Sequence, residues 1–257
     1  MKVVLFCGGL GTRLREYSET MPKPLVPVGD RPIIWNIMKY YAHYGHKDFI
    51  LCLGYRGDLI KDYFLKYNEC MTNDFLLRSG REVELVNQDL QDWNIMFVDT
   101  GLHANIGSRL MAVKHLLEGE EYFLANYSDG LSDLPLDQHI QEARTRRAVA
   151  SFLSVRPSHT FHPVSVDEDG LVTGIEAVRS SNLWINGGFF VLNKAVFNFM
   201  EPGDELVEAP FQRLIREKKL VSYQYGGFWA SMDTFKDKKM FDAMCDVGQT
   251  PWQVWRS

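Results

Sequence analysis

The sequence of 257 residues predicts an α/β fold built on a parallel sheet. In the first third of the chain, short apolar runs rich in β-branched residues alternate with segments whose apolar residues recur at helical spacing. This alternation is typical of parallel strands joined by right-handed crossovers. No stretch rich in Pro, Gly or Ser is long enough to separate two units, so we expect a single domain over residues 1–257.

The individual elements follow from the same patterns. The first strand, Lys2 to Cys7, stops at Gly8 and Gly9, and the last predicted strand is interrupted by Gly187 and Gly188. In chain order we expect strands over residues 2–7, 49–53, 82–87, 94–99, 122–125, 148–155 and 185–192 and helices over 32–44, 58–67, 108–117 and 136–147. In open α/β sheets ligands bind beyond the carboxyl ends of the strands, so the chemistry is expected in the loops that follow them.

The composition excludes several classes of protein. Hydrophobic residues make up 46% and charged residues 24%, as in globular proteins, and the longest apolar runs fall far short of the ~20 residues that cross a membrane. A net charge of −5 argues against nucleic acid as a partner, because that attraction depends on Lys and Arg. The four cysteines show no C-x-x-C spacing, so we expect reduced thiols and a cytoplasmic protein.

The first strand leads directly into a glycine-rich loop with basic residues. The loop reads Gly8-Gly9-Leu10-Gly11-Thr12-Arg13, and Pro22-Lys23-Pro24 follows. Glycines let backbone N–H groups approach phosphates, and Thr12, Arg13 and Lys23 add a hydroxyl and two positive charges. A tight turn with surface charges is the alternative for the glycines alone. The loop matches neither the Walker A motif nor the dinucleotide fingerprint, and the full pattern predicts a triphosphate site.

The segment from Gly8 to Pro24 resembles the signature of sugar-phosphate nucleotidyltransferases. Further segments resemble the glucose-1-phosphate cytidylyltransferase branch, namely Lys47-Asp48-Phe49-Ile50, Gly54-Tyr55, Val98-Asp99-Thr100-Gly101, Gly107 with Arg109-Leu110, Tyr127-x-Asp129-Gly130, Ile185-Asn186-Gly187-Gly188-Phe189-Phe190 and Phe228-Trp229-x-x-Met232-Asp233-Thr234. The resemblance implies a Rossmann-like nucleotidyltransferase fold, a mixed, mostly parallel sheet flanked by helices. It also implies Mg²⁺, a homo-oligomer and the transfer of CMP from CTP to a sugar 1-phosphate, with release of pyrophosphate.

The same resemblance assigns roles to individual residues. Asp129 and Asp233 become the metal ligands, although an Asp after a strand is, by itself, more often a turn or cap residue. Mg²⁺ commonly takes one or two carboxylates and completes its octahedron with water and substrate phosphates. The implied catalytic residues are Arg13, Lys23 and Asp129, the nucleotide-binding residues are Gly8, Gly9, Gly11, Thr12, Arg13, Lys23, Thr100, Gly107 and Arg109, and the acceptor-binding residues are Glu176, Arg179 and Asn186.

The acceptor half departs from the family pattern. Related enzymes carry a Glu-Lys-Pro triplet whose lysine binds the acceptor phosphate. In this sequence the triplet aligns with Glu176-Ala177-Val178, so alanine stands in place of the lysine. Arg179, two residues further on, is a candidate replacement for that charge. Two alternatives therefore stay open: a cytidylyltransferase with a non-sugar phosphorylated or phosphonate acceptor, and a nucleotide-binding regulator without turnover.

Overall fold

The computed structural model describes residues 1–9, 21–90, 92–157, 162–176, 178 and 182–256. An eight-stranded sheet forms the centre of the molecule. Its first half is parallel: β1 (Val3–Cys7) lies between β4 (Asp48–Leu53) and β8 (Tyr122–Tyr127), and β7 (Asn94–Asp99) pairs with β4. All five residues of β1 are buried, which explains its unbroken apolar sequence.

The second half of the sheet introduces antiparallel pairs. β14 (Phe190–Asn193) runs antiparallel to both β8 and β10 (Ala150–Val155), and β13 (Ile185–Asn186) also pairs antiparallel with β10. β15 (Leu220–Tyr225) then pairs parallel with β10. The predicted mixed, mostly parallel sheet is confirmed, and Gly187 and Gly188 divide the expected strand 185–192 into β13 and β14.

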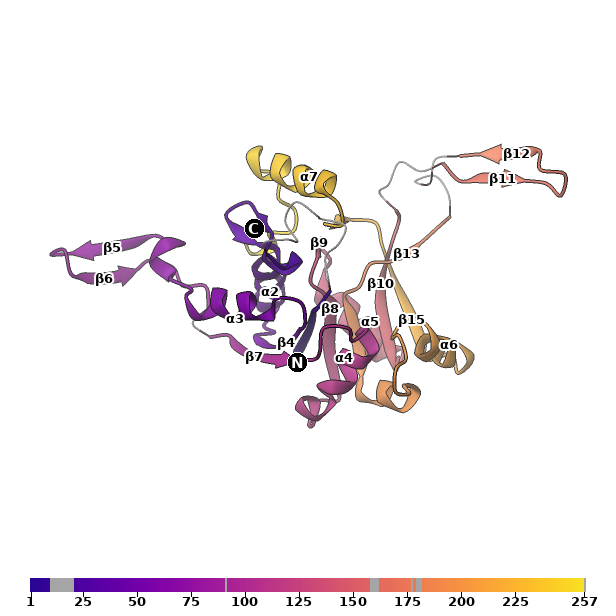
Figure 1. The fold of residues 1–257 in the computed structure, drawn as a ribbon, viewed down its shortest axis with the longest axis horizontal. Helices are drawn as coiled ribbons and strands as arrows, with labels where there is room; N and C mark the ends of the chain where they lie inside the picture. Colours follow the sequence, from indigo (N-terminus) through magenta and orange to yellow (C-terminus); the bar gives the residue numbers. More distant parts are fainter. Residues whose placement is uncertain (10–20, 91, 158–161, 177, 179–181, 257) are drawn as a thin grey trace.

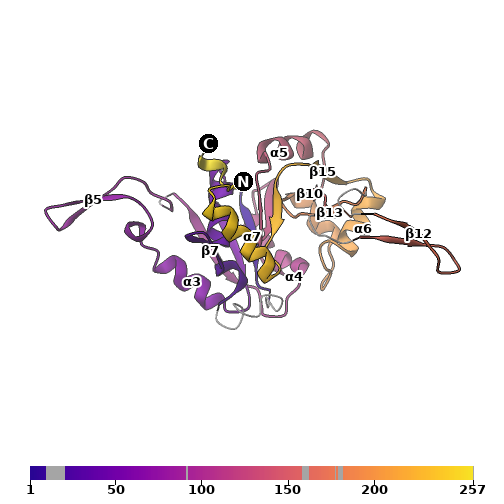
Figure 2. The same cartoon turned by 90° about the horizontal axis from the view of Figure 1, so that it is seen from above.

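Helices cover both faces of this sheet (Figures 1 and 2). One buried cluster joins the sheet to α2 (Ile33–His43), α5 (Leu136–Thr145) and α7 (Phe235–Asp246), and the other joins it to α4 (Ile106–Ala112) and α6 (Ala209–Arg216). The other described elements are α3 (Gly57–Leu65), the strands β2 (Pro27–Val28), β3 (Arg31–Pro32), β9 (Gly130–Ser132) and β16 (Trp229–Ser231), and the 3-10 turns η1 (Lys23–Leu25), η2 (Glu69–Met71), η3 (Lys114–Leu117), η5 (Lys194–Phe199) and η6 (Val254–Arg256). The expected helix 108–117 is therefore two elements, because the chain leaves the α-helix at Val113.

The aromatic C-terminal segment packs against the core. Trp252 is 1% exposed and contacts the rings of Phe228 and Phe241, while Trp255 lies edge-on to Trp35 of α2 with 6.0 Å between ring centroids. Within the described residues, no helix is both long and apolar enough to cross a membrane.

Two β-ribbons project from the body at opposite ends of the molecule (Figures 1 and 2). The first, which we call arm 1, is formed by β5 (Phe75–Arg78) and β6 (Glu82–Leu85), and arm 2 by β11 (Val164–Val166) and β12 (Val172–Ile175). The strand expected at 82–87 exists as β6, but it pairs within arm 1 and not within the central sheet. Both arms expose large apolar side chains.

Candidate active site

Two aspartates from distant parts of the sequence meet at one lysine. The Lys23 ammonium lies 2.6 Å from Asp129 Oδ2 and 2.9 Å from Asp233 Oδ1. Burial by itself lowers the pKa of Lys23, but its pairs with Asp129 and Asp233 outweigh burial and raise this pKa above the ordinary value. Asp129 and Asp233 therefore belong to one small site, which the sequence alone could not show.

A short β-ribbon brings these aspartates together. Asp129 directly precedes β9 and Asp233 follows β16, and these two strands pair with Ser231 opposite Gly130. The backbone N–H of Met232 also donates to the Asp129 carbonyl oxygen at 2.8 Å. Ribbon pairing thus fixes the distance between two residues that are far apart in the chain.

Asp233 is held in place through both its carboxylate and its backbone N–H. The Ser231 hydroxyl donates to Asp233 Oδ2 at 2.8 Å, and the Asp233 N–H donates to Asp237 Oδ2 at 3.1 Å. Thr234 and Asp237 form a capping box that begins α7. The Met-Asp-Thr element is consequently a strand end joined to a helix cap, and this geometry aims Asp233 at Lys23.

The chemistry of these donors fits a magnesium ion that also takes phosphate ligands. Asp129 and Asp233 supply two carboxylates at one point, and their side chains are 27% and 36% exposed, so phosphate oxygens and water have access. No group of three or more His, Cys, Asp or Glu side chains that could hold a metal occurs in the described part of the chain. A cation here would share its coordination with a substrate.

Arg109 is a buried arginine that ties three strand ends together. Its guanidinium donates to the Leu53 carbonyl at 2.9 Å, to the Thr100 hydroxyl at 2.7 Å and to the Gly8 carbonyl at 3.0 Å. These acceptors follow or end β4, β7 and β1, and Arg109 itself is 2% exposed. Burial lowers the pKa of Arg109 below its ordinary value, yet an arginine keeps its charge in proteins. The guanidinium thus lies under the start of the glycine loop, where a phosphate chain is expected.

The glycines of the predicted site differ in their surroundings. A Cβ at Gly8 would lie 2.0 Å from Arg109 Cζ, whereas one at Gly9 would meet no atom of the described residues within 4 Å. Gly8 therefore makes room for the guanidinium, and the open space lies at Gly9. At Gly107 a Cβ would lie 2.1 Å from the Asp204 carbonyl oxygen, so tight packing already requires glycine there. Roles for these glycines in nucleotide binding stay predictions.

On the acceptor side, Asn186 is connected to the Asp129 loop and Glu176 is not. Asn186 Nδ2 donates to the Tyr127 hydroxyl at 3.2 Å, and Tyr127 ends β8 just before Asp129. Glu176 is exposed at the base of arm 2, where its N–H donates to the Pro163 carbonyl at 3.3 Å. Gly11, Thr12, Arg13, Ala177 and Arg179 lie outside the described residues.

Three residues of this region were not predicted as site residues. Tyr127 holds Asn186, Ser231 holds Asp233, and the Trp229 indole donates to the Gly187 carbonyl at 2.8 Å. Tyr127 and Trp229 lie inside segments that resemble the family, so the sequence marked both segments without marking these two side chains. Ser231 carries no comparable sequence signal.

Comparisons with known proteins agree with this geometry. A family model described as nucleotidyl transferase matches residues 2–250. The chain is 38% identical to "Probable glucose-1-phosphate cytidylyltransferase" of Bacillus subtilis (strain 168) and 34% identical to glucose-1-phosphate cytidylyltransferase of Salmonella typhi. Each alignment covers 99% of this chain and 100% of the relative.

The solved structures show the fold alone, because their sequence identities are low. A UDP-glucose pyrophosphorylase structure complexed with UDP-glucose superposes with a TM-score of 0.71 at 17% identity and covers 96% of this chain and 98% of its own. HddC from Yersinia pseudotuberculosis superposes with a TM-score of 0.68 at 19% identity, and the alignment covers 95% of this chain and 99% of the HddC chain. With the family match spanning nearly the whole sequence, the chain belongs to the nucleotidyltransferase family, and its resemblance to the cytidylyltransferase branch is confirmed.

Proposed function

We propose that this chain transfers CMP from CTP to a sugar 1-phosphate and releases pyrophosphate. The convergence of Asp129 and Asp233 on Lys23, beside strand ends that carry a glycine loop, is the observation that supports this function best. Relatives that match over their full length and carry the name glucose-1-phosphate cytidylyltransferase support the choice of CTP and of the acceptor.

The reaction needs positioning and charge neutralisation more than covalent help. An oxygen of the acceptor phosphate attacks the α-phosphorus of CTP, the bond between that phosphorus and the oxygen bridging to the β-phosphate breaks, and pyrophosphate leaves with the electron pair. The acceptor phosphate is already anionic at neutral pH, so no side-chain nucleophile or general base is required. Preorganised positive charge at the phosphates lowers the barrier of such a transfer.

In this proposal, different residues bind the metal, the triphosphate and the acceptor. Asp129 and Asp233 would hold Mg²⁺, which supplies positive charge to the phosphate oxygens when bound. Lys23, whose ammonium lies beside both carboxylates, would bind the triphosphate. Arg109 keeps the ends of β1, β4 and β7 in register, and its buried charge attracts the phosphate chain. Asn186 and Glu176, together with Arg179, would bind the acceptor.

The test is pyrophosphate release with Mg²⁺, glucose 1-phosphate and each of CTP, UTP, GTP, ATP and dTTP. We expect release with CTP and at least tenfold slower release with the others. Release only with another phosphorylated or phosphonate acceptor would overturn the sugar 1-phosphate assignment, and CTP binding without release under any acceptor would indicate the silent regulator.

We further propose that the chain forms a homo-oligomer through its two arms. An isolated two-stranded ribbon is marginal in water, and arm 2 exposes Val166, Leu171, Val172 and Ile175 to 59%, 67%, 62% and 67%. A second copy of the chain is the occupant that fits, because a symmetric assembly covers the same patch on every subunit. Light scattering after size-exclusion chromatography should give a multiple of 29.6 kDa, and a Leu171→Lys, Ile175→Lys variant should shift it toward the monomer.

We also place the reaction in the cytoplasm, since all four cysteines are free thiols, as expected in a reducing compartment.

A further inference from the structure

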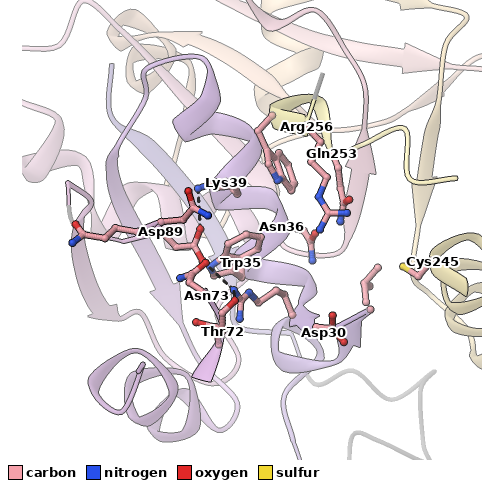
Figure 3. Close-up of a pocket in the computed structure, with 16 residues that line it drawn as sticks. Asp30, Trp35, Asn36, Lys39, Thr72, Asn73, Asp89, Cys245, Gln253 and Arg256 are labelled. Carbon is pink, nitrogen blue, oxygen red and sulfur yellow. Dashed lines mark hydrogen bonds and ion pairs between the residues drawn. The ribbon is translucent and has the colours of Figure 1, made fainter. Parts of the chain in front are cut away.

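A large cavity lies between α2, the base of arm 1 and the C-terminal segment (Figure 3). Its volume is about 660 Å³, within the usual range for small-molecule sites. Of the predicted catalytic, nucleotide-binding, metal-binding and acceptor-binding residues that the structure describes, none lines it. The cavity is thus separate from the Lys23, Asp129 and Asp233 site.

The lining of this cavity suits a ligand with hydroxyl groups. Trp35 and Trp255 provide apolar surface, and side-chain amides lie around them, with Asn36 of α2 and Gln253 of the C-terminal segment approaching the same space in Figure 3. The amides of the lining are Asn36, Asn73, Asn87, Gln88 and Gln253. Amides both donate and accept hydrogen bonds, which is what a ring bearing several hydroxyl groups requires.

The charges of the lining favour a ligand that is also an anion. Asp89 pairs with Arg31 and Lys39, each at 3.0 Å, and although burial by itself raises the pKa of Asp89, the bond from Lys39 helps to lower it below the ordinary value. Asp89 is therefore ionised and already neutralised by these two cations. Arg256 adds a further positive charge and makes no ion pair within the described chain, while the exposed Asp30 can accept a hydrogen bond from a hydroxyl group.

A buried donor in the wall of the cavity points to the same conclusion. Trp35 is 5% exposed, and its indole N–H has no hydrogen-bond partner among the described residues. Such unsatisfied buried groups are rare in folded proteins and call for a missing partner. An oxygen atom of a ligand seated beside the Trp35 and Trp255 pair could supply that partner.

We propose that this cavity is a second binding site, one for a phosphorylated sugar. The phosphate pairs with Arg256, the amides and Asp30 bind the hydroxyl groups, and the sugar ring lies against the half-buried Trp255. Because Arg31 also donates to the Thr72 carbonyl at 2.7 Å, the cavity wall includes the base of arm 1, so the bound ligand contacts the element that carries the arm.

The chain contains its own reporters for this site. It has six tryptophans, of which Trp35 and Trp255 line the cavity, whereas Trp229 lies beside the acceptor region of the proposed active site. In protein labelled with 5-fluorotryptophan, ¹⁹F NMR follows each of them, with signals assigned by single Trp→Phe variants. Glucose 6-phosphate, inorganic phosphate and glucose serve as probes, since none of them is the acceptor proposed for the reaction.

We expect glucose 6-phosphate to shift the signals of Trp35 and Trp255 saturably, with phosphate or glucose alone at least tenfold weaker. Arg256→Ala should weaken this binding tenfold or more, because a hydrogen bond to a charged group is lost. Arg216→Ala, which removes an exposed arginine of α6 away from the cavity, should leave it unchanged.

Three results would overturn the proposal. They are the absence of any shift at Trp35 and Trp255 up to about 10 mM probe, shifts confined to Trp229, and equal binding of inorganic phosphate, which would exclude recognition of the sugar. The readout is independent of turnover, so failure of this site and failure of the proposed reaction remain distinguishable.

Discussion

The nucleotide side and the acceptor side of the candidate active site are built differently. On the nucleotide side, Arg109 joins the ends of β1, β4 and β7 from a fully buried position. On the acceptor side, Glu176 is exposed at the base of arm 2, and Asn186 makes its described side-chain contacts to Tyr127 and to the N–H of Gly188. The departures from the family pattern, Ala177 and Val178, directly follow Glu176 on the acceptor side. An acceptor pocket can thus change while the nucleotide pocket stays constant.

The aspartate pair lies at Lys23, where the proposed magnesium site would form, and its loss should have the largest effect. Asp129→Asn or Asp233→Asn should each slow pyrophosphate release by at least ~100-fold, because preorganised charge at the transition state is lost. Asp246→Asn, at the exposed end of α7, is the matched control. Rates within twofold of the unaltered protein would remove that aspartate from the site.

Acid should weaken the strands next to the acceptor side before those of the nucleotide side. His139 of α5 is fully buried, its Nε2 lies 2.9 Å from the Ser151 hydroxyl of β10, and burial lowers its pKa to about 4. Since an unfolded histidine has a pKa near 6.5, the unfolded state binds more protons between these values, and stability falls as pH drops from 6.5 to 4.

The loss at His139 should reach about 3 kcal/mol near pH 4. Chemical denaturation from pH 7.5 to 4 checks the magnitude, and hydrogen exchange should show β10 and β15 losing protection before β1 and β4. His139→Gln should remove part of the loss of stability at acid pH. The half-buried His46 accounts for part of the loss that remains, because burial also lowers its pKa to about 4. An unchanged pH profile in His139→Gln would contradict this assignment.

Two adjacent glycines provide a matched test of the nucleotide side. Gly8→Ala should destabilise the protein by ~1–3 kcal/mol and weaken CTP binding, because the added methyl group collides with the Arg109 guanidinium. Gly9→Ala, whose methyl group meets no atom of the described residues within 4 Å, should leave the stability nearly unchanged. Denaturation midpoints and CTP titrations measure both. Equal stability of the two variants would show that Arg109 does not constrain the loop.

A substitution on the acceptor side should have the smallest effect on activity, and this effect should be confined to one substrate. Asn186→Ala should raise the KM for the acceptor about tenfold, because it removes a side-chain amide that bonds to the acceptor. The KM for CTP should change less than threefold, because this amide makes no bond to CTP in the proposal. Asn198→Ala, on a turn away from the site, serves as the control. A parallel rise of both KM values would mean that the two sides are not independent.

Much of the fold and part of the site followed from local sequence. The apolar runs that became β1, β4, β8 and β10 could be predicted directly because these strands are largely buried and bounded by turn residues. The pairing of β6 could not, because an alternating strand shows which side chains share a face and not which strand is its partner. The break of the helix at Val113 was likewise invisible to periodicity.

By itself the sequence determined the α/β class, the order of its elements and the family, together with the aspartates, lysine and arginine that carry the expected chemistry. Only the tertiary structure decided that Asp129 and Asp233 meet at Lys23, that Gly8 makes room for Arg109, and that a second cavity forms beside the C-terminal segment. The physical reason is the same for each. Strand pairing and side-chain packing set distances between residues far apart in the chain, and these distances leave no local trace in the sequence.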